Sequence, residues 1–142
     1  MPALGGSTLK GLLQEIFRPY PASDDGRMAI VGDDVAIDDR GATPIALVFH
    51  ELATNAAKYG ALSSAEGRVD VEITRTGEAV RITWRETRGP TVQGEPERTG
   101  FGTRLAELSV AQQLGGVIRR EWKPGGLCVE IEVLVNRLSR DL

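Results

Sequence analysis

The sequence predicts an α+β fold in which helices cover one face of a β-sheet. The prediction rests on segments with apolar residues at helical spacing, on segments with alternating apolar residues, and on the order in which the two kinds occur. With 142 residues and 41% hydrophobic content, the chain is long enough for one compact domain with its own core. We expect this domain at residues 7–136, between a linker or artificial end at 1–6 and a polar tail at 137–142.

The first forty residues predict one helix and two short strands. Apolar residues recur at helical spacing over 7–16, and Pro19 and Pro21 then stop the helix. Turn residues follow, and the apolar runs 28–31 and 35–37 predict strands separated by a Gly-Asp-Asp turn.

The clearest helix of the sequence begins near Gly41 and runs to Tyr59. Pro44 is compatible with its first turn, and Gly60 is expected to end it. Its predicted apolar face consists of Ile45, Val48, Leu52, Ala56 and Tyr59.

Four strands and one more helix are expected in the second half of the chain. The strands are placed at 69–76, 80–86, 117–122 and 127–135, and the helix at 103–114. Gly77 marks a hairpin between the first two of these strands. Residues 87–102 are rich in Gly, Pro, Arg and Glu, and they predict a loop long enough to act as a lid.

Charge and cysteine content exclude several classes of protein. The net charge is −3, and the sequence has no basic stripe of the kind that nucleic-acid binders show. No apolar run is long enough to cross a bilayer, so we expect no membrane segment. The single cysteine, Cys128, cannot form an internal disulfide and is expected in the core, which fits a reducing, cytoplasmic location.

The helix at 41–59 carries a stripe of polar residues. Glu51, Asn55 and Lys58 are four and three residues apart and therefore share one helix face. A carboxylate, an amide oxygen and an ammonium group in line could hold a hard cation and the phosphates that it bridges. A solvated helix face would give the same pattern, and both interpretations stay open on this segment alone.

The strand at 80–86 predicts an inward-facing carboxylate. Glu86 has the same parity as Trp84 and the apolar residues of the strand, so its side chain points toward the core. A buried carboxylate needs a partner, because an unpaired buried charge is costly. The exocyclic amine of a purine would serve, and so would the guanidinium group of Arg81 or Arg104.

A glycine-rich turn opens the helix that follows the long loop. Gly100 and Gly102 would let the backbone approach phosphate oxygens closely, and the helix N-terminus would supply free amides. Glycines also begin helices for purely geometric reasons, so this motif gains its weight from the lid-like loop before it.

In this order and spacing, the three segments resemble the ATP-binding domain shared by histidine kinases, DNA gyrase and related ATPases. His50 directly precedes Glu51, and Trp84 stands two residues before Glu86; both pairs resemble the HWE subfamily of sensor histidine kinases. The resemblance covers residues 9–135. It implies a two-layer α+β sandwich with a mixed sheet covered on one face by about three helices, and with an ATP lid loop.

The resemblance also implies roles for single residues. Asn55 would bind Mg²⁺ with Glu51 beside the metal, Lys58 would reach a phosphate, and these three would be the catalytic residues. Glu86 would accept a hydrogen bond from the adenine amino group, and Tyr59 would pack near the adenine. The remaining ATP contacts would come from Gly89, Gly100, Phe101, Gly102, Thr103 and Leu105.

The implied reaction is transfer of the ATP γ-phosphoryl group to a histidine nitrogen. In the family this histidine lies on a separate dimerisation domain, which we do not find in this chain, and a response regulator acts downstream. His50 is not expected to be the acceptor, because it lies within the nucleotide-binding helix. It would order the pocket by hydrogen bonding or serve the structure alone. Without dimerisation helices, we expect a mostly monomeric chain.

One position departs from the family pattern, and three other functions stay open. Arg88 stands where the family usually has glycine, which could alter the purine pocket or add a phosphate contact. The alternatives are a serine kinase of the anti-sigma-factor type, an ATP hydrolase in which Glu51 activates water, and an interaction module that binds no nucleotide.

Overall fold

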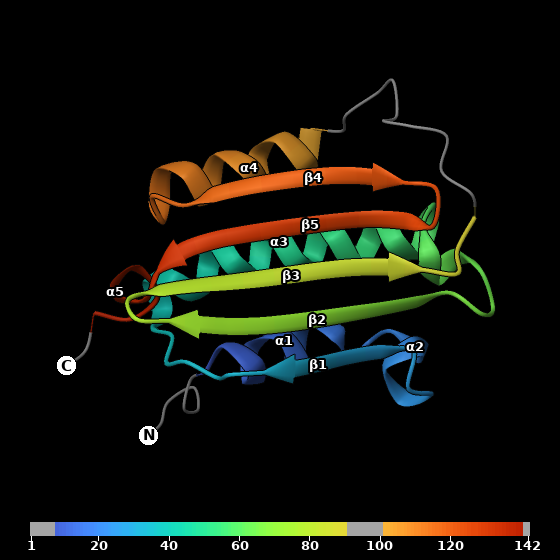
Figure 1. Cartoon of the computed structure of the whole chain (residues 1–142), viewed down its shortest axis with the longest axis horizontal. Helices are drawn as coiled ribbons and strands as arrows, with labels where there is room; N and C mark the ends of the chain where they lie inside the picture. The colour runs from blue at the N-terminus through green and yellow to red at the C-terminus, as the bar shows by residue number, and fades with distance from the viewer. Residues whose placement is uncertain (1–7, 91–100, 141–142) are drawn as a thin grey trace.

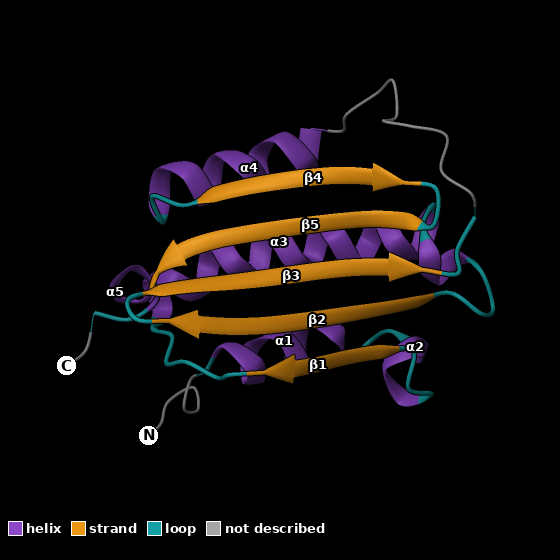
Figure 2. Ribbon diagram, viewed as in Figure 1, coloured by secondary structure: helices purple, strands orange, loops and turns teal. Residues whose placement is uncertain are grey.

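The computed structural model describes residues 8–90 and 101–140 and contains one five-stranded sheet (Figures 1 and 2). The strand order is β1-β2-β3-β5-β4; β1 and β2 are parallel, and the other pairs are antiparallel. The strands are β1 Met28–Gly32, β2 Arg68–Thr76, β3 Ala79–Thr87, β4 Val117–Lys123 and β5 Gly126–Leu134. The predicted mixed sheet is confirmed.

Three helices cover the same face of this sheet (Figure 1). They are α1 Leu9–Phe17, α3 Asp39–Lys58 and α4 Phe101–Gln113. The expected two-layer α+β sandwich with about three covering helices is therefore confirmed. Three short elements were not expected: α2 Pro21–Asp24, the 3₁₀ turn η2 Ala61–Ser63 and α5 Val135–Leu138. Most of the expected lid loop, residues 91–100, lies outside the described residues.

The sheet has one apolar and one charged face because its strands alternate in polarity. On β3, Val80, Ile82 and Trp84 are fully buried under the helices. The opposite face carries ion pairs between neighbouring strands, such as that of Arg81 with Glu132 at 2.7 Å. Cys128 lies on this charged face and is half-buried, so its expected place in the core is wrong.

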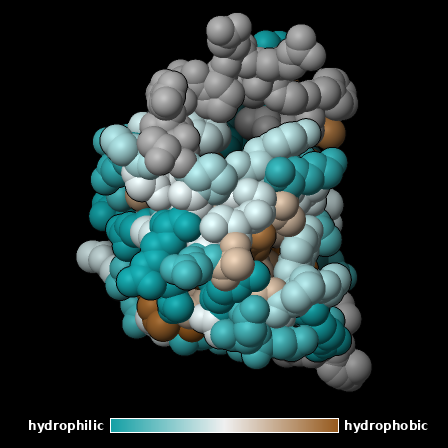
Figure 3. All heavy atoms as spheres, turned by 90° about the vertical axis from the view of Figure 1, so that its right-hand side faces the viewer, coloured by the Kyte–Doolittle hydropathy of each residue, from teal (hydrophilic) through white to brown (hydrophobic). Residues whose placement is uncertain are grey.

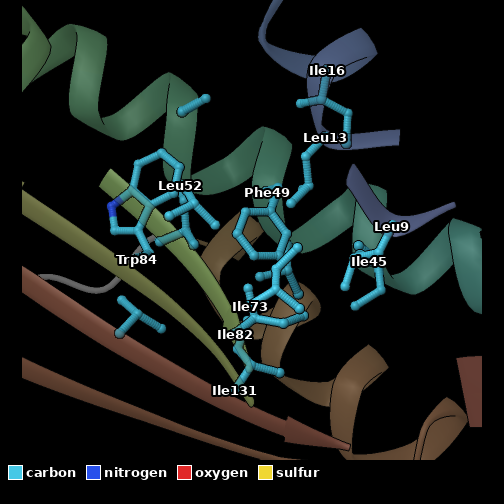
Figure 4. Packing of buried hydrophobic residues seen from close by; sticks show 14 of the residues in the cluster. Leu9, Leu13, Ile16, Ile45, Phe49, Leu52, Ile73, Ile82, Trp84 and Ile131 are labelled. Atoms are coloured by element: carbon cyan, nitrogen blue, oxygen red, sulfur yellow. The ribbon is translucent and has the colours of Figure 1, made fainter. Parts of the chain in front are cut away.

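The centre of the core is an aromatic cluster between α3 and the sheet (Figure 4). Trp84 projects from β3 toward α3, with ring centroids 6.0 Å from Phe49 and 5.9 Å from Phe17. All three side chains are buried, and Leu52 of α3 packs beside them. Burial of this much aromatic surface fixes α3 firmly over β3, the strand that carries Glu86.

The central helix begins before the predicted start. Asp38 is the N-cap, and its Oδ1 accepts a hydrogen bond from the Gly41 N–H at 3.0 Å. The helix therefore starts at Asp39, and Pro44 lies in its second turn instead of its first. The predicted apolar face is buried except for Tyr59, which is 75% exposed at the C-cap.

Two other expectations are wrong for identifiable reasons. Residues 35–37 form no strand: Ala36 makes a single bridge to Thr8, because this segment crosses beside α1 and not along the sheet. The expected polar tail is partly core, since Leu138 is fully buried in α5 and its carbonyl accepts a hydrogen bond from the Asp38 N–H at 2.8 Å. The folded domain thus extends beyond residue 136.

Candidate functional site

The ends of α3 and β3 meet at one end of the sandwich, with η2 between them. In Figure 1 this is the right-hand end, whereas α4 begins nearer the middle of the molecule. Figure 3 looks onto this end and shows a small apolar area within a mostly hydrophilic face. The predicted polar residues of α3 and β3 are thereby brought to the same region of the molecule.

The predicted stripe on α3 is present. The amide Nδ2 of Asn55 donates a hydrogen bond to Oε2 of Glu51 at 2.9 Å, and both side chains are partly buried. Lys58 follows one turn later as the last residue of the helix and is exposed. The carboxylate of Glu51 thus orients the amide of Asn55, which leaves the amide oxygen as the group suited to a hard cation.

These oxygen ligands do not form a metal cage of their own. Among the described residues, no cluster of three or more His, Cys, Asp or Glu side chains has the arrangement needed to hold a metal ion. A cation beside Asn55 and Glu51 would therefore need further oxygens from a bound ligand and water. That combination is how proteins usually hold Mg²⁺ on phosphate groups.

Glu86 is the buried carboxylate of the site. It is 6% exposed; its Oε1 accepts a hydrogen bond from the Ala61 N–H, and its Oε2 accepts one from the Trp84 indole Nε1–H, both at 3.0 Å. Burial raises the pKa of Glu86, while these hydrogen bonds and the positive charge of Arg120 oppose the shift. The site therefore holds a carboxyl group in low-dielectric surroundings with two fixed donors.

Neither of the two arginines considered as ion-pair partners of Glu86 pairs with it. Arg81 points to the opposite face of the sheet and pairs with Glu132, and the side chain of Arg104 is exposed on α4. The reason for the first is strand parity, because residues five apart on a strand face opposite sides. Of the alternatives left open for Glu86, the ion pair with Arg81 or Arg104 is therefore not the one found.

Close backbone packing surrounds Glu86. A Cβ atom at Gly60 would collide with Glu86 Oε1, and one at Gly89 would lie 2.5 Å from the Cα of Ala61. Arg88, which directly precedes Gly89, has a φ of 59° and is the one non-glycine residue with positive φ in the ranges that the structure describes. The glycine expected at this position thus has a conformational reason, since left-handed backbone favours glycine.

The other predicted contact residues belong to the beginning of α4 or precede it in the sequence. Gly102 is in the first turn of α4, because the helix begins at Phe101, two residues before the predicted start. Leu105 on the same helix is 42% exposed. Gly100 and the side chains of residues 101–103 lie outside the described part. His50 is exposed on α3, so its expected pocket-ordering role stays a prediction.

Two participants in the site carried little sequence signal. Ala61 acts through its backbone N–H, which no residue type reveals. Arg120 lies on the inner face of β4; its Nε donates to Glu107 Oε2 at 2.6 Å, and its buried Nη2 has no partner within the described ranges. The alternation of Ile118, Arg120 and Trp122 placed this cation on the apolar face and could have revealed it.

Comparison with curated proteins finds histidine kinases. The chain is 37% identical over 129 residues to blue-light-activated histidine kinase 1 of Erythrobacter litoralis, covering 89% of this chain and 35% of that protein. It is 32% identical over 130 residues to the blue-light-activated histidine kinase of Brucella ovis, covering 89% of this chain and 26% of that protein. The chain thus spans about a third or less of these relatives. No family model matches the chain.

Comparison with solved structures finds the same fold. The catalytic domain of histidine kinase ThkA superposes with a TM-score of 0.68 at 19% identity, covering 90% of this chain and 94% of that one. The histidine kinase domain of Erythrobacter litoralis EL346 gives 0.68 at 23% identity, covering 89% and 66%. ThkA has also been solved in complex with the response regulator TrrA. In the described part of this chain, no helix is long and apolar enough to span a membrane.

Proposed function

We propose, from the premise that this chain belongs with the HWE-type sensor histidine kinases that it matches, that it is their ATP-binding catalytic domain. In this role it transfers the γ-phosphoryl group of ATP to a histidine of another domain. The observation that carries the proposal is the meeting of a buried acceptor carboxylate, Glu86, with the Asn55–Glu51 pair at one end of the sandwich.

Glu86 would recognise the adenine. Its two oxygens already accept one N–H each, and a carboxylate oxygen has a second acceptor position. The exocyclic amino group of adenine is a donor of the required kind. Gly60 and Gly89 support this interpretation, because their missing side chains let the backbone approach the carboxylate and the adjoining turn closely. Tyr59, exposed at the C-cap of α3, and Leu105, exposed on α4, would pack against the bound nucleotide.

Asn55 and Glu51 fit a Mg²⁺ ion that arrives with the triphosphate. Their hydrogen bond at 2.9 Å aligns an amide oxygen and a carboxylate, both of which are preferred Mg²⁺ ligands. Bound Mg²⁺ would neutralise charge that develops on the phosphate oxygens. Lys58, exposed one turn further along α3, would add a positive charge at the phosphates. Gly102 and Thr103 in the first turn of α4, together with Gly100 just before it in the sequence, would supply backbone contacts to them.

The phosphoryl acceptor would come from a histidine-bearing dimerisation domain of the same kinase, with a response regulator as the next acceptor. His50 is a poor candidate, because it is exposed on the helix that carries the metal ligands and cannot turn toward them. The complex of ThkA with a response regulator supports the choice of downstream partner by analogy of fold. A cytoplasmic location would follow from this role.

A phosphotransfer assay tests the proposal directly. The chain is mixed with ATP labelled at the γ-phosphate, Mg²⁺ and the histidine-bearing helical domain of the Erythrobacter litoralis relative. We expect acid-labile, base-stable label on that domain, lost in Asn55→Ala and kept in Asn136→Ala, an exposed asparagine far along the chain.

The other outcomes separate the alternatives. Acid-stable label on a serine of a partner would favour a serine kinase. Release of phosphate without any partner, lost in Glu51→Gln, would favour a hydrolase in which Glu51 acts as the general base. Failure of the folded chain to bind nucleotide at all would leave a module for protein interaction.

A further inference from the structure

Two N–H donors from the protein hold the carboxyl group of Glu86 in place. Ala61 offers a backbone N–H, and Trp84 offers an indole N–H, each 3.0 Å from a different oxygen of the carboxyl group. Neither donor can accept a hydrogen bond. Both oxygens therefore act as acceptors toward these donors, and a proton on either oxygen would weaken the hydrogen bond that this oxygen accepts.

The indole donor is held in place by the aromatic cluster of the core. Trp84 is fully buried and packs edge-on against Phe17 and at a tilt against Phe49, so its ring plane is set by the core (Figure 4). It lies two residues before Glu86 on the same face of β3. The orientation of the N–H group is thus determined by the packing of α1 and α3 onto the sheet.

Two influences compete for the state of the carboxyl group. Burial raises the pKa of Glu86 and so favours the neutral form, which can donate a hydrogen bond. The donors from Ala61 on η2 and Trp84 on β3, together with the charge of Arg120 on β4, favour the acceptor form. Without the indole donor, the balance moves toward a carboxyl group that can either donate or accept.

We propose that Trp84 is a positioning residue that keeps Glu86 an acceptor and thereby makes the site select purines with an amino group at position 6 over purines with a carbonyl there. The inference rests on the proposed nucleotide site and adds to it the residue that sets its choice of base. A 6-amino group donates to an acceptor carboxylate, whereas a 6-carbonyl oxygen meets it with unfavourable electrostatics.

The test compares ADP with inosine diphosphate, which carries a carbonyl in place of the 6-amino group. Affinities are measured by calorimetry for the wild-type chain, for Trp84→Phe and for Trp122→Phe. Trp122 is a matched control, because it lies on the inner face of β4 and the described contacts include no hydrogen bond from it to Glu86. We expect Trp84→Phe to weaken ADP binding about tenfold and to leave inosine diphosphate binding nearly unchanged, as loss of a charge-assisted hydrogen bond requires. Trp122→Phe should keep the wild-type ratio.

Loss of packing would give a different result. Phe is smaller than Trp, so a merely structural effect would weaken both nucleotides in parallel and leave their ratio unchanged, which would overturn the inference. If Trp84→Phe does not fold, β-(3-benzothienyl)alanine at position 84 removes the N–H and keeps the ring shape; the same fall in the ratio is then required. Failure of the wild-type chain to bind either nucleotide would instead overturn the proposed function itself, before any variant is compared.

Discussion

At the scale of the residue, Glu86 combines a buried carboxyl group with two fixed hydrogen-bond donors. Its side chain is almost inaccessible, and the direction of its pKa shift is upward because burial outweighs the donors from Ala61 and Trp84 and the charge of Arg120. A carboxyl group with a raised pKa binds its proton more tightly in the folded chain than in the unfolded chain. The stability of the nucleotide-free chain should therefore depend on pH through this residue.

The sign of that dependence follows from the shift. Below about pH 4.5, the ordinary pKa of a glutamate side chain, Glu86 is protonated in both the folded and the unfolded chain and does not change the free energy of unfolding. As the pH rises from there through the higher folded pKa, the folded state retains a proton that the unfolded state has lost, so the free energy of unfolding falls. Glu86→Gln should remove this fall. Chemical denaturation at a series of pH values measures it, and an equal slope in wild type and Glu86→Gln would contradict the assignment.

Arg88 is held in a backbone conformation that suits glycine. Its φ is 59°, and it directly precedes Gly89, whose backbone lies close to that of Ala61. A left-handed backbone conformation costs a non-glycine residue about 1–2 kcal/mol. Glycine avoids this cost, but it loses more conformational entropy on folding, which offsets part of the advantage. We expect Arg88→Gly to raise the free energy of unfolding by roughly 0.5–1 kcal/mol. Arg85→Gly, in extended β3, should lower it, and a destabilised Arg88→Gly chain would show that the side chain makes contacts that matter more than the backbone.

At the scale of the element, the start of α3 is joined to the end of the chain through Asp38. One carboxylate oxygen caps the helix at the Gly41 N–H, and the other accepts from the Arg140 N–H at 2.9 Å. The Asp38 N–H in turn donates to the carbonyl of Leu138. Burial raises the pKa of Asp38, but hydrogen bonds from the N–H groups of Arg140, Gly41 and Arg40 outweigh it and lower the pKa below 3.8.

Removal of this cap should destabilise the whole domain. Asp38→Ala removes both hydrogen bonds, and we expect a loss of about 1–2 kcal/mol in the free energy of unfolding at neutral pH. The wild-type advantage should disappear as the pH falls through the lowered pKa of Asp38, since the stabilising form is the charged one. Asp39→Ala, which removes an exposed charge in the first helical turn, is the control and should cost less than half as much.

Leu138 provides the apolar half of the same junction. Leu138 is fully buried. Its polar neighbours, Asn136 and Arg137, give the segment the composition of a solvent-exposed tail. Leu138→Ala should lower the free energy of unfolding by about 2–4 kcal/mol through lost burial and the cavity that remains. Thermal unfolding measures this, with Leu134→Ala, an exposed leucine four residues earlier, as the control. A loss no larger than that of the control would show that this end of the chain does not belong to the core.

At the scale of the whole molecule, the architecture could be predicted from the sequence because its helices and strands follow periodic patterns of apolar residues. The alternation in β2, β3 and β5 and the helical spacing in α1 and α3 are set by which side chains face one core. The parity that placed Glu86 inside follows from the same rule and holds in the structure. Features without a period, such as the burial of Leu138 and the donor role of the Ala61 N–H, depend on contacts across the chain and could not be read from the sequence.

The proposed nucleotide site depends both on periodic features and on contacts across the chain. The shared helix face of Asn55 and Glu51 was expected from their spacing on α3, and the structure adds the hydrogen bond between them. The partners of Glu86 proved to be a backbone amide and an indole, not an arginine. Local spacing fixes what lies on one helix face, but the partner of a buried group is chosen by the packing of distant elements. The sequence thus predicted the residues that we propose bind the nucleotide and Mg²⁺, but not the groups that donate hydrogen bonds to Glu86.

Calorimetric titration with a non-hydrolysable ATP analogue, with and without Mg²⁺, tests the central claim most directly. We expect binding that Mg²⁺ strengthens, that Asn55→Ala weakens mainly in the presence of Mg²⁺, and that Glu86→Gln weakens in both conditions, because one residue acts at the metal and the other at the base. Asn136→Ala should bind as the wild type does. A folded wild-type chain that binds no nucleotide in either condition would contradict the account and indicate a domain that acts by binding a protein partner.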